Sequence, residues 1–259
     1  MVTEGDWAGL AAGRSDPTGE LTVTACLQQG KGSAANPFLA TASDGDQWWV
    51  KAPASGLTKA LVTEYVVGRV GSLVGAPVCD VAVIEIPKVL LPWEFRPGQQ
   101  LPTGYGSATR DLAGVVEEIY GALTHRNEDD NARRHGGVYA LVDWCFGHDL
   151  QWLLHRSDQW RLYSHDHGWY FPPDGPGWTM DHLRVTADRN KALPCDPAGL
   201  DEAYLGTLAD SLDAITREAL RKIILEVPPS WPVTDAELEC LGWYLEHRAP
   251  MVASRLRAL

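Results

Sequence analysis

The stretch Trp160-Arg161-Leu162-Tyr163-Ser164-His165-Asp166-His167-Gly168 decides the fold class, because it joins a strand-like run to an acidic residue and a glycine. A second acidic loop, Gly147-His148-Asp149, follows an apolar run over residues 138–146. The two aspartates are 17 residues apart (166 − 149). Two carboxylates on loops beside a rigid scaffold suit a catalytic base and a metal ligand, the pair that phosphoryl transfer requires.

The length and composition of the chain are those of a soluble enzyme with an ample core. Its 259 residues are 45% hydrophobic and 22% charged, enough for one large domain or a two-lobed one. The net charge of −12 argues against a general nucleic-acid binder, because neutralising phosphates requires a basic face. No run approaches the ~18 apolar residues of a membrane span, and the acidic N-terminus lacks the features of a signal peptide. We therefore expect a cytoplasmic protein that binds neither nucleic acid nor membrane.

Hydrophobic periodicity divides the chain into a β-rich part and a helical part. A proline- and glycine-rich stretch predicts the link between them, so we expect an N-lobe over residues 1–105 and a C-lobe over 106–259. The prediction is an α+β, protein-kinase-like bilobal fold with a small antiparallel β-rich N-lobe and a larger, mainly helical C-lobe. Strand patterns cover residues 21–27, 38–42, 47–51 and 77–86, and helix patterns cover 59–73, 111–123, 132–146 and 201–226, with a capping box at 234–237 opening a last helix.

Three features of the predicted N-lobe suit nucleotide binding. The turn with Gly30, Gly32 and Ser33 lies between strands, where glycine lets backbone N–H groups approach phosphates; a plain hairpin turn is the alternative. Lys51 ends a strand, so its ammonium group is expected to point at the α- and β-phosphates. Glu64 follows in the next helix and would orient that lysine. Each residue alone also suits an ordinary surface position.

The two acidic loops receive distinct roles. Asp149 could orient and deprotonate an attacking hydroxyl, and Asp166 would hold Mg²⁺, a cation that prefers carboxylate oxygen. Gly168 would let the backbone turn sharply after Asp166. Either aspartate alone is more often a cap or turn residue. Their joint appearance behind Lys51 and Glu64, in this order, favours a phosphotransferase site.

A metal-dependent hydrolase is the alternative chemistry for this region. His148, Asp149, His165 and His167 are candidate zinc or iron ligands, but their spacing is not HExxH and they leave Lys51 without a role. The five scattered cysteines lack CxxC spacing and predict neither a zinc cluster nor a disulfide framework. Arg133 or Arg134 could contact phosphate, although such a polar stretch is more typical of a solvated helix start.

At these motifs the chain resembles the HipA-like kinase family, particularly its short single-chain members. The matching motifs lie at residues 32–38, 49–51, 64–69, 143–149 and 164–168. The resemblance implies a kinase-like bilobal fold, ATP and Mg²⁺ as cofactors, and transfer of the γ-phosphate to a hydroxyl. By position, Lys51 would contact phosphates, Asp149 would be the base and Asp166 the metal ligand.

The chain departs from the family pattern after Asp149. The family has an asparagine five residues later as a second metal ligand, where this chain has Leu154; Gln151 is the candidate substitute, with His155 as an alternative. Glu85, in the fourth predicted strand, completes the candidate nucleotide-binding set. We expect a kinase-like phosphotransferase whose acceptor is a serine or threonine of a protein, or a small molecule. The alternative is a nucleotide-binding pseudokinase that regulates or scaffolds a partner.

Overall fold

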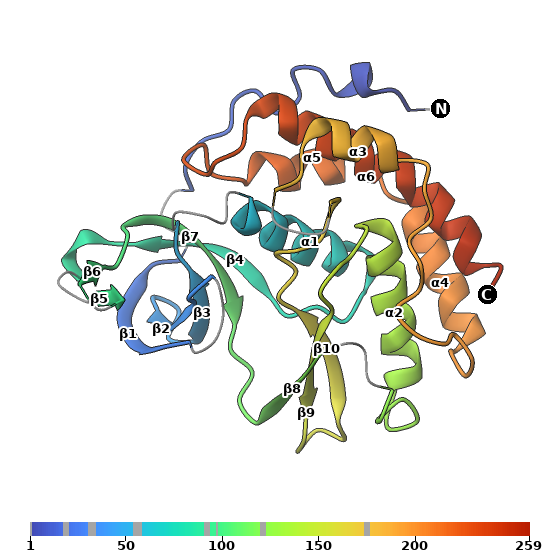
Figure 1. Cartoon of the computed structure of the whole chain (residues 1–259), viewed down its shortest axis with the longest axis horizontal. Helices are drawn as coiled ribbons and strands as arrows, with labels where there is room; N and C mark the ends of the chain where they lie inside the picture. The colour runs from blue at the N-terminus through green and yellow to red at the C-terminus, as the bar shows by residue number, and fades with distance from the viewer. Residues whose placement is uncertain are drawn as a thin grey trace.

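The computed structural model describes residues 2–17, 21–30, 35–53, 59–90, 94–96, 98–119, 123–173 and 177–259. Figure 1 shows a β-rich part, which contains the first strands, beside a larger part in which helices dominate. This arrangement agrees with the predicted α+β architecture. Among the described residues, no helix combines the length and apolar character needed to cross a membrane.

The N-terminal part is built on one five-stranded antiparallel sheet. A bridge between Thr22 and Glu85 brings the two edges of this sheet together, so the sheet curls, as its β1–β3 end shows in Figure 1. Trp48 and Val50 of the third strand are buried in a core of their own, whereas Trp49 and Lys51 face the other side. The strands are β1 (Val23–Gln29), β2 (Phe38–Ala42), β3 (Gln47–Lys51), β7 (Gly104–Arg110) and β4 (Val81–Ile86), in the spatial order β1-β2-β3-β7-β4.

A second antiparallel sheet of three strands, in the order β10-β9-β8, carries the acidic loops at one end. Its strands are β8 (Val115–Ile119), β9 (Gln151–His155) and β10 (Arg161–His165). The helix expected over residues 111–123 is therefore wrong. Val115–Ile119 pairs with β9 along its full length, and this pairing of a β-branched run decides the local structure over its weak helical periodicity. A short hairpin of β5 (Glu94–Arg96) and β6 (Gln99–Gln100) lies at the edge of the molecule.

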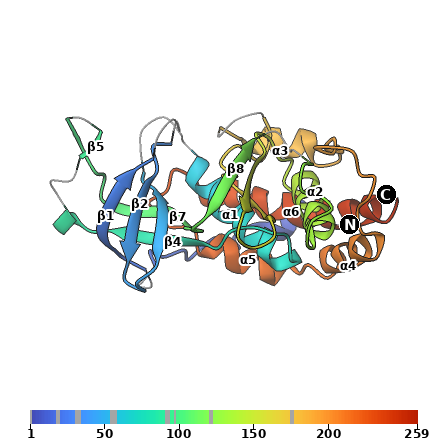
Figure 2. The same cartoon turned by 90° about the horizontal axis from the view of Figure 1, so that it is seen from below.

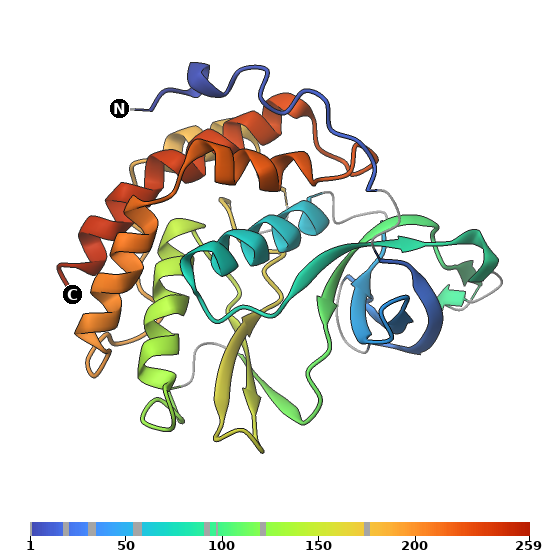
Figure 3. The same cartoon turned by 180° about the vertical axis from the view of Figure 1, so that it is seen from behind.

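The helices pack into one large core together with Trp152, Leu154 and Leu162 of the three-stranded sheet. Figures 2 and 3 show α1 between the sheet and the C-terminal helices. The helix expected over 201–226 is two helices, because the chain turns at Ala214 and Thr216 caps a new start. The helices are α1 (Ala60–Val74), α2 (Asn131–Trp144), α3 (Met180–Thr186), α4 (Glu202–Asp213), α5 (Arg217–Leu225) and α6 (Asp235–Leu256), with short 3-10 turns η1 (Glu4–Trp7) and η2 (Lys88–Leu90). The capping box at Thr234 and Glu237 forms as predicted.

The boundary expected between the lobes lies inside a strand of the first sheet. The boundary predicted between residues 105 and 106 falls inside β7, which pairs with β3 and β4 as far as Arg110. The N-terminal segment also lies against the C-terminal helices (Figure 3), where buried Trp7 donates a hydrogen bond to Glu246 of α6 at 2.6 Å. We propose that the link between the lobes follows Arg110, and that the first residues of the chain pack with the C-lobe.

The core of the C-lobe contains a fully buried arginine. Arg248 of α6 is 0% exposed, and its guanidinium donates to the carbonyl oxygens of Trp144, Thr186, Ala187 and Arg189 and to the Asp143 carboxylate. These contacts join α6 to the end of α2 and to the segment after α3. The fold tolerates this buried charge because each guanidinium nitrogen donates hydrogen bonds to protein oxygen atoms.

We expect Arg248→Met to lower the free energy of unfolding by about 3 kcal/mol or more, because it leaves buried carbonyl groups without their donor and removes one of the two arginines that pair with Asp143. Urea denaturation monitored by tryptophan fluorescence measures the change. Arg257→Met is the control, since Arg257 pairs with Asp210 and Asp213 at the surface of the same helix end. Equal stability of the two variants would contradict the importance of the buried contacts.

His135 of α2 makes stability depend on pH. The side chain is 1% exposed, its Nδ1 lies 2.8 Å from the Asn131 carbonyl, and burial followed by the nearby Arg126 charge lowers its pKa to about 4. As the pH falls, the unfolded chain protonates His135 before the folded chain does. The contribution of neutral His135 to the free energy of unfolding is therefore complete above about pH 6.5 and is lost as the pH falls toward 4. From pH 7 to pH 5 the loss is roughly 2 kcal/mol. In His135→Gln, the fall in the free energy of unfolding between pH 7 and pH 5 should be smaller by this amount. An unchanged fall would contradict the assignment.

Candidate active site

Lys51, whose side chain is largely but not fully buried, joins three separate segments of the chain. Lys51 leaves β3 on the side opposite the N-terminal core, and its Nζ lies 2.7 Å from Glu64 Oε2 and 2.6 Å from Asp166 Oδ1. The Glu64 carboxylate belongs to α1 and is almost completely buried, and Asp166 follows β10. The structure therefore brings together Lys51, Glu64 and Asp166, which the sequence analysis placed in one site.

The charges of this group stabilise one another. Burial disfavours the ammonium form of Lys51, but the nearby Asp166 and Glu64 carboxylates outweigh burial and raise the pKa of the lysine above its ordinary value. Burial also opposes the charge of Asp166, yet the Lys51 ammonium lowers the pKa of Asp166 below its ordinary value. Lys51 stays cationic and Asp166 stays anionic through the neutral range, as phosphate and metal binding require.

The two acidic loops are held side by side. Asp149 and Asp166 both adopt left-handed backbone conformations, with φ of 50° and 52°, which aspartate tolerates better than most residues. Phe171 N–H donates to the Cys145 carbonyl at 2.9 Å, and so ties the segment after Asp166 to the segment before Asp149. At Gly147 a Cβ atom would lie 2.7 Å from the Tyr170 ring, so only glycine permits this approach.

Gln151 lies at the start of β9 between the two aspartates. Its Nε2 donates to Asp149 Oδ2 at 3.1 Å, and its backbone pairs with His165, the neighbour of Asp166. This contact leaves the amide oxygen of Gln151 for another ligand. Carboxylate and amide oxygens are ligands that Mg²⁺ accepts, and this cation is usually held by one or two carboxylates together with phosphate oxygens and water. Asp166 and Gln151 therefore offer oxygen ligands that suit a magnesium ion, whose remaining ligands would be phosphate oxygens and water.

Leu154, which stands at the expected asparagine position, cannot reach a metal in this fold. The strand β9 begins only two residues after Asp149, so its side chains already alternate, and Leu154 faces the core with 2% exposure. His155 lies four residues beyond Gln151, about 13 Å along an extended strand. Of the two substitutes considered, Gln151 is the one that lies beside the aspartates.

A cleft of about 520 Å³ opens in front of Lys51. Side chains of β3, the link after β7 and the three-stranded sheet line it, and its wall near the first hairpin includes Gly30, whose N–H donates to the Pro37 carbonyl at 2.6 Å. Gly32 and Ser33 lie outside the described residues. The lining comprises Gln28, Gly30, Pro37, Leu39, Trp49, Lys51, Glu64, residues 109–115, Glu117, Leu153, His165 and Asp166.

Glu85 is not part of this cleft, and its assignment to nucleotide binding is corrected. It lies in β4, which β7 separates from β3, and Thr22 Oγ1 donates to its carboxylate at 3.4 Å. Its role is to help join β1 and β4. Arg133 and Arg134 also lie elsewhere and pair with Asp201 and Asp129 at the start of α2.

Glu117 is a cleft residue that the sequence analysis missed. It stands on β8 opposite Leu153, and its Oε1 lies 3.7 Å from His165 Nε2. Burial, followed by the charges of Asp166 and Asp149, raises the pKa of Glu117 above its ordinary value. The predicted helix over this segment concealed it, whereas the β-branched residues Val115, Val116 and Ile119 were the available signal for a strand.

The histidines near the acidic loops do not form a metal site. Burial lowers the pKa of His165 to about 4 and that of His167 to about 3, and His167 Nε2 lies 2.8 Å from Ser164 Oγ. In the described part of the chain, no three His, Cys, Asp or Glu side chains gather as a metal-binding group. The geometry gives no support to the zinc or iron hydrolase alternative.

The start of α1, which carries Glu64, is fixed to the C-lobe. Lys59 Nζ pairs with Glu237 of α6, donates to the Trp178 carbonyl at 2.7 Å and lies 4.2 Å from the centre of the Trp178 ring. Trp178 Nε1 in turn donates to Thr63 Oγ1 at 3.0 Å. These buried contacts sit within one helical turn or so of Glu64 and set its position. No sequence pattern indicated these contacts, because the three partners are far apart along the chain.

Comparisons with known proteins agree with this geometry. Residues 23–144 match the family model described as HipA-like kinase, which confirms the resemblance indicated by the sequence. The crystal structure of a Helicobacter pylori proinflammatory kinase, CtkA, is similar with a TM-score of 0.52 and 12% identity, covering 90% of this chain and 95% of that one. This likeness shows a shared kinase fold. No curated protein sequence matches the chain.

Two structures of the Golgi casein kinase are similar at a lower level. One has a TM-score of 0.48 and 11% identity and covers 98% of this chain and 75% of that one. The other, which has Mn/ADP bound, has a TM-score of 0.47 and 11% identity and covers 99% of this chain and 76% of that one. These weaker likenesses support no inference about this chain.

We expect Lys59→Met to lower the free energy of unfolding by about 2 kcal/mol and to speed amide hydrogen exchange in the first turns of α1, because Glu237 then loses its buried partner. Hydrogen exchange followed by mass spectrometry measures the second effect. Lys59→Arg should restore part of the protection, since the charge is kept. Lys222→Met, an exposed position on α5, is the control; equal exchange in α1 for both methionine variants contradicts this role.

Proposed function

We propose that this chain, which resembles HipA-like kinases over residues 23–144, is an ATP- and Mg²⁺-dependent phosphotransferase. It would move the γ-phosphate of ATP to a hydroxyl, either a serine or threonine of a protein or a hydroxyl of a small molecule. The observation that carries this proposal is the ion-paired group of Lys51, Glu64 and Asp166 at a cleft between two lobes. Kinases place a strand lysine, a helix glutamate and a metal-binding aspartate in this relation.

The cleft supports nucleotide binding by its size and lining. Its volume of about 520 Å³ lies within the usual range for cofactor sites, about 300–1,000 Å³. Lys51 would contact phosphate oxygens as a fixed positive charge, and Glu64 would hold it in place. Asp166, together with the amide oxygen of Gln151, would hold Mg²⁺, which supplies positive charge to the phosphates when bound. Backbone and side-chain groups at 109–115 would surround the base.

Asp149 is proposed as the base that receives the acceptor proton. The acceptor oxygen forms a bond to the γ-phosphorus while the bond from that phosphorus to its bridging oxygen breaks. The bond's electron pair leaves with ADP, and the hydroxyl proton passes to the Asp149 carboxylate. The hydrogen bond from Gln151 fixes one oxygen of that carboxylate and leaves the other for the acceptor.

A nucleotide-binding pseudokinase is the second candidate. Its support is Leu154, which is buried in the core where a second metal ligand would otherwise stand. The two candidates differ in outcome: a pseudokinase binds ATP and is stabilised by it without transferring phosphate to any acceptor. Stabilisation by a ligand that binds only the folded state is a general effect, so thermal shifts alone do not separate them.

Label transfer from γ-labelled ATP tests the proposal. We expect autophosphorylation or acceptor labelling that needs Mg²⁺ and falls about 10²-fold or more in Asp149→Asn, because removal of a general base costs this much. Asp149→Asn should still bind nucleotide in a Mg²⁺-dependent way. In Asp166→Asn, nucleotide binding should no longer depend on Mg²⁺. Asp210→Asn, exposed on α4, is the matched control. Binding without transfer in the wild type would favour the pseudokinase, and absence of ATP binding would reject both candidates.

A further inference from the structure

We propose that the indole ring of Trp49 is the surface on which the nucleotide base stacks, and that this ring makes the cleft prefer purine to pyrimidine nucleotides. The inference rests on the proposed phosphotransfer function and names the residue that recognises its nucleotide. Trp49 lines the cleft of about 520 Å³ that opens in front of Lys51. Among the described lining residues it is the one tryptophan, tyrosine or phenylalanine.

The position of Trp49 along β3 suits contact with a base. Trp49 and Lys51 are two residues apart on this strand, so both side chains leave the same face of the sheet. Their Cα atoms are therefore about 7 Å apart. Lys51 would contact the phosphates, and the ribose would span this separation. The base would then lie beside the indole ring.

Apolar side chains from both sheets line the cleft around this position. Leu39 and Thr109 pair with Trp49 across the first sheet and belong to the same lining. Val115 of β8 and Leu153 of β9 line the cleft from the three-stranded sheet. A flat base between the two sheets would have an aromatic ring on one face and aliphatic side chains on the other.

Trp49 lies outside both hydrophobic cores. Its neighbour Trp48 is buried in the N-terminal core, whereas neither core of described residues contains Trp49. The Trp49 side chain is only partly buried. Tryptophan is highly buried on average and contributes a large apolar area wherever it packs. A partly exposed ring at the wall of a cleft therefore offers this area to a ligand.

The ring is held in a fixed orientation by the link between the lobes. Trp49 Nε1 donates to Asp111 Oδ1 at 2.8 Å. The Asp111 backbone N–H donates in turn to the Gln47 carbonyl at 2.9 Å, so the residue that orients the ring is itself fixed to the start of β3. A ring that is ordered before binding loses little conformational freedom when a base stacks on it.

Stacking on an indole favours purines by their size. Every base has a face that stacks on an aromatic side chain. The two fused rings of a purine cover more of the indole than the single ring of a pyrimidine, so a purine removes more apolar area from water. The ligand class that suits Trp49 is therefore a purine nucleotide, and the preference should depend on the aromatic ring.

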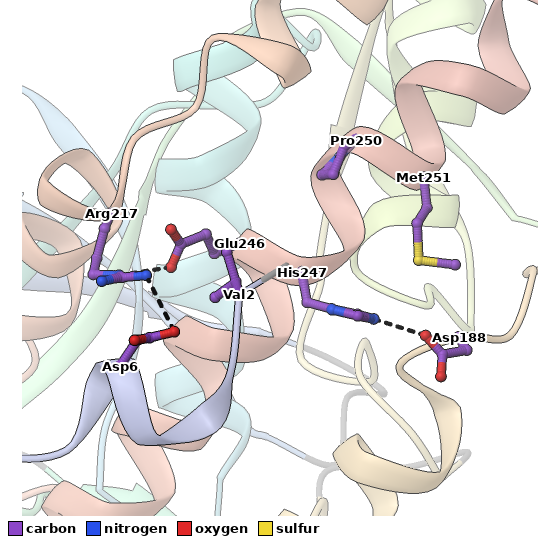
Figure 4. A pocket seen from close by; sticks show the side chains of 8 residues that line it. All are labelled: Val2, Asp6, Asp188, Arg217, Glu246, His247, Pro250 and Met251. Carbon is purple, nitrogen blue, oxygen red and sulfur yellow. Dashed lines mark hydrogen bonds and ion pairs between the residues drawn. The ribbon is translucent and has the colours of Figure 1, made fainter.

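A second cleft of similar volume, lined mainly by η1 and α6, lacks such a surface. It encloses about 490 Å³, and its described lining contains no tryptophan, tyrosine or phenylalanine. Its charged groups are paired with one another: Arg217 with Glu246, and His247 with Asp188 (Figure 4). Size alone therefore does not make a base-binding site here, and the comparison favours the cleft that Trp49 lines.

Binding of ADP and CDP tests this inference without requiring catalysis, because neither carries a γ-phosphate. Isothermal titration calorimetry measures both against the full chain with Mg²⁺. We expect the wild type to bind ADP about five-fold or more tightly than CDP. Trp49→Leu should weaken ADP binding by about ten-fold or more and bring the two affinities close together, because base stacking is lost. Trp49→Phe, which keeps an aromatic ring, should keep most of the preference for ADP.

The matched control is Trp160→Leu, which removes an indole that stacks on His125 outside the cleft. It should keep both wild-type affinities. A purely structural role of Trp49 would weaken ADP and CDP equally, and this outcome would overturn the inference. Unchanged ADP binding in Trp49→Leu, or no purine preference in the wild type, would also overturn it and leave the proposed function standing. If the wild type binds neither nucleotide, the proposed function fails together with the inference.

Discussion

Lys51 forms ion pairs with both Glu64 of α1 and Asp166 at the end of β10, and the site depends on these two ion pairs. A lone ammonium group buried at this depth would lose its proton or disrupt the fold, because burial disfavours charge. The Glu64 and Asp166 carboxylates stabilise the charged form of Lys51. Because they lie on different elements, they also fix the first sheet, α1 and the loop after β10 relative to one another. Breaking one pair would leave an unbalanced charge, so the arrangement is stable only when all three elements are in place.

The loop that contains Asp149 is held in place by buried contacts in the core of the C-lobe. Arg248 donates to the Trp144 carbonyl and the Asp143 carboxylate at the end of α2, directly before the turn that leads to Asp149. Gly147 lets the Tyr170 ring approach, and this contact joins the loop to the segment after Asp166. The positions of both aspartates are therefore set by buried contacts of neighbouring residues.

Sequence patterns predicted those parts of the structure that local chemistry determines. The strands ending at Ala42 and Lys51, the helix with Glu64 and the two acidic loops all follow from periodicity and residue type. Other features depend on partners far along the chain. Val115–Ile119 is a strand because β9 lies beside it, and Lys59 is buried because Trp178 and Glu237 fold over it. Glu85 was placed in the nucleotide site because sequence order does not reveal that β7 separates β4 from β3.

The anchoring of α1 by Lys59 has a consequence for how the nucleotide cleft opens. Glu64 and Asp166 are both attached to the helical lobe, whereas Lys51 belongs to the five-stranded sheet, which precedes the proposed link after Arg110. A hinge movement of the sheet away from the helices therefore separates Lys51 from both carboxylates at the same moment. Opening of the cleft and loss of both ion pairs are then a single event, so the two ion pairs of Lys51 oppose the movement of the sheet away from the helices.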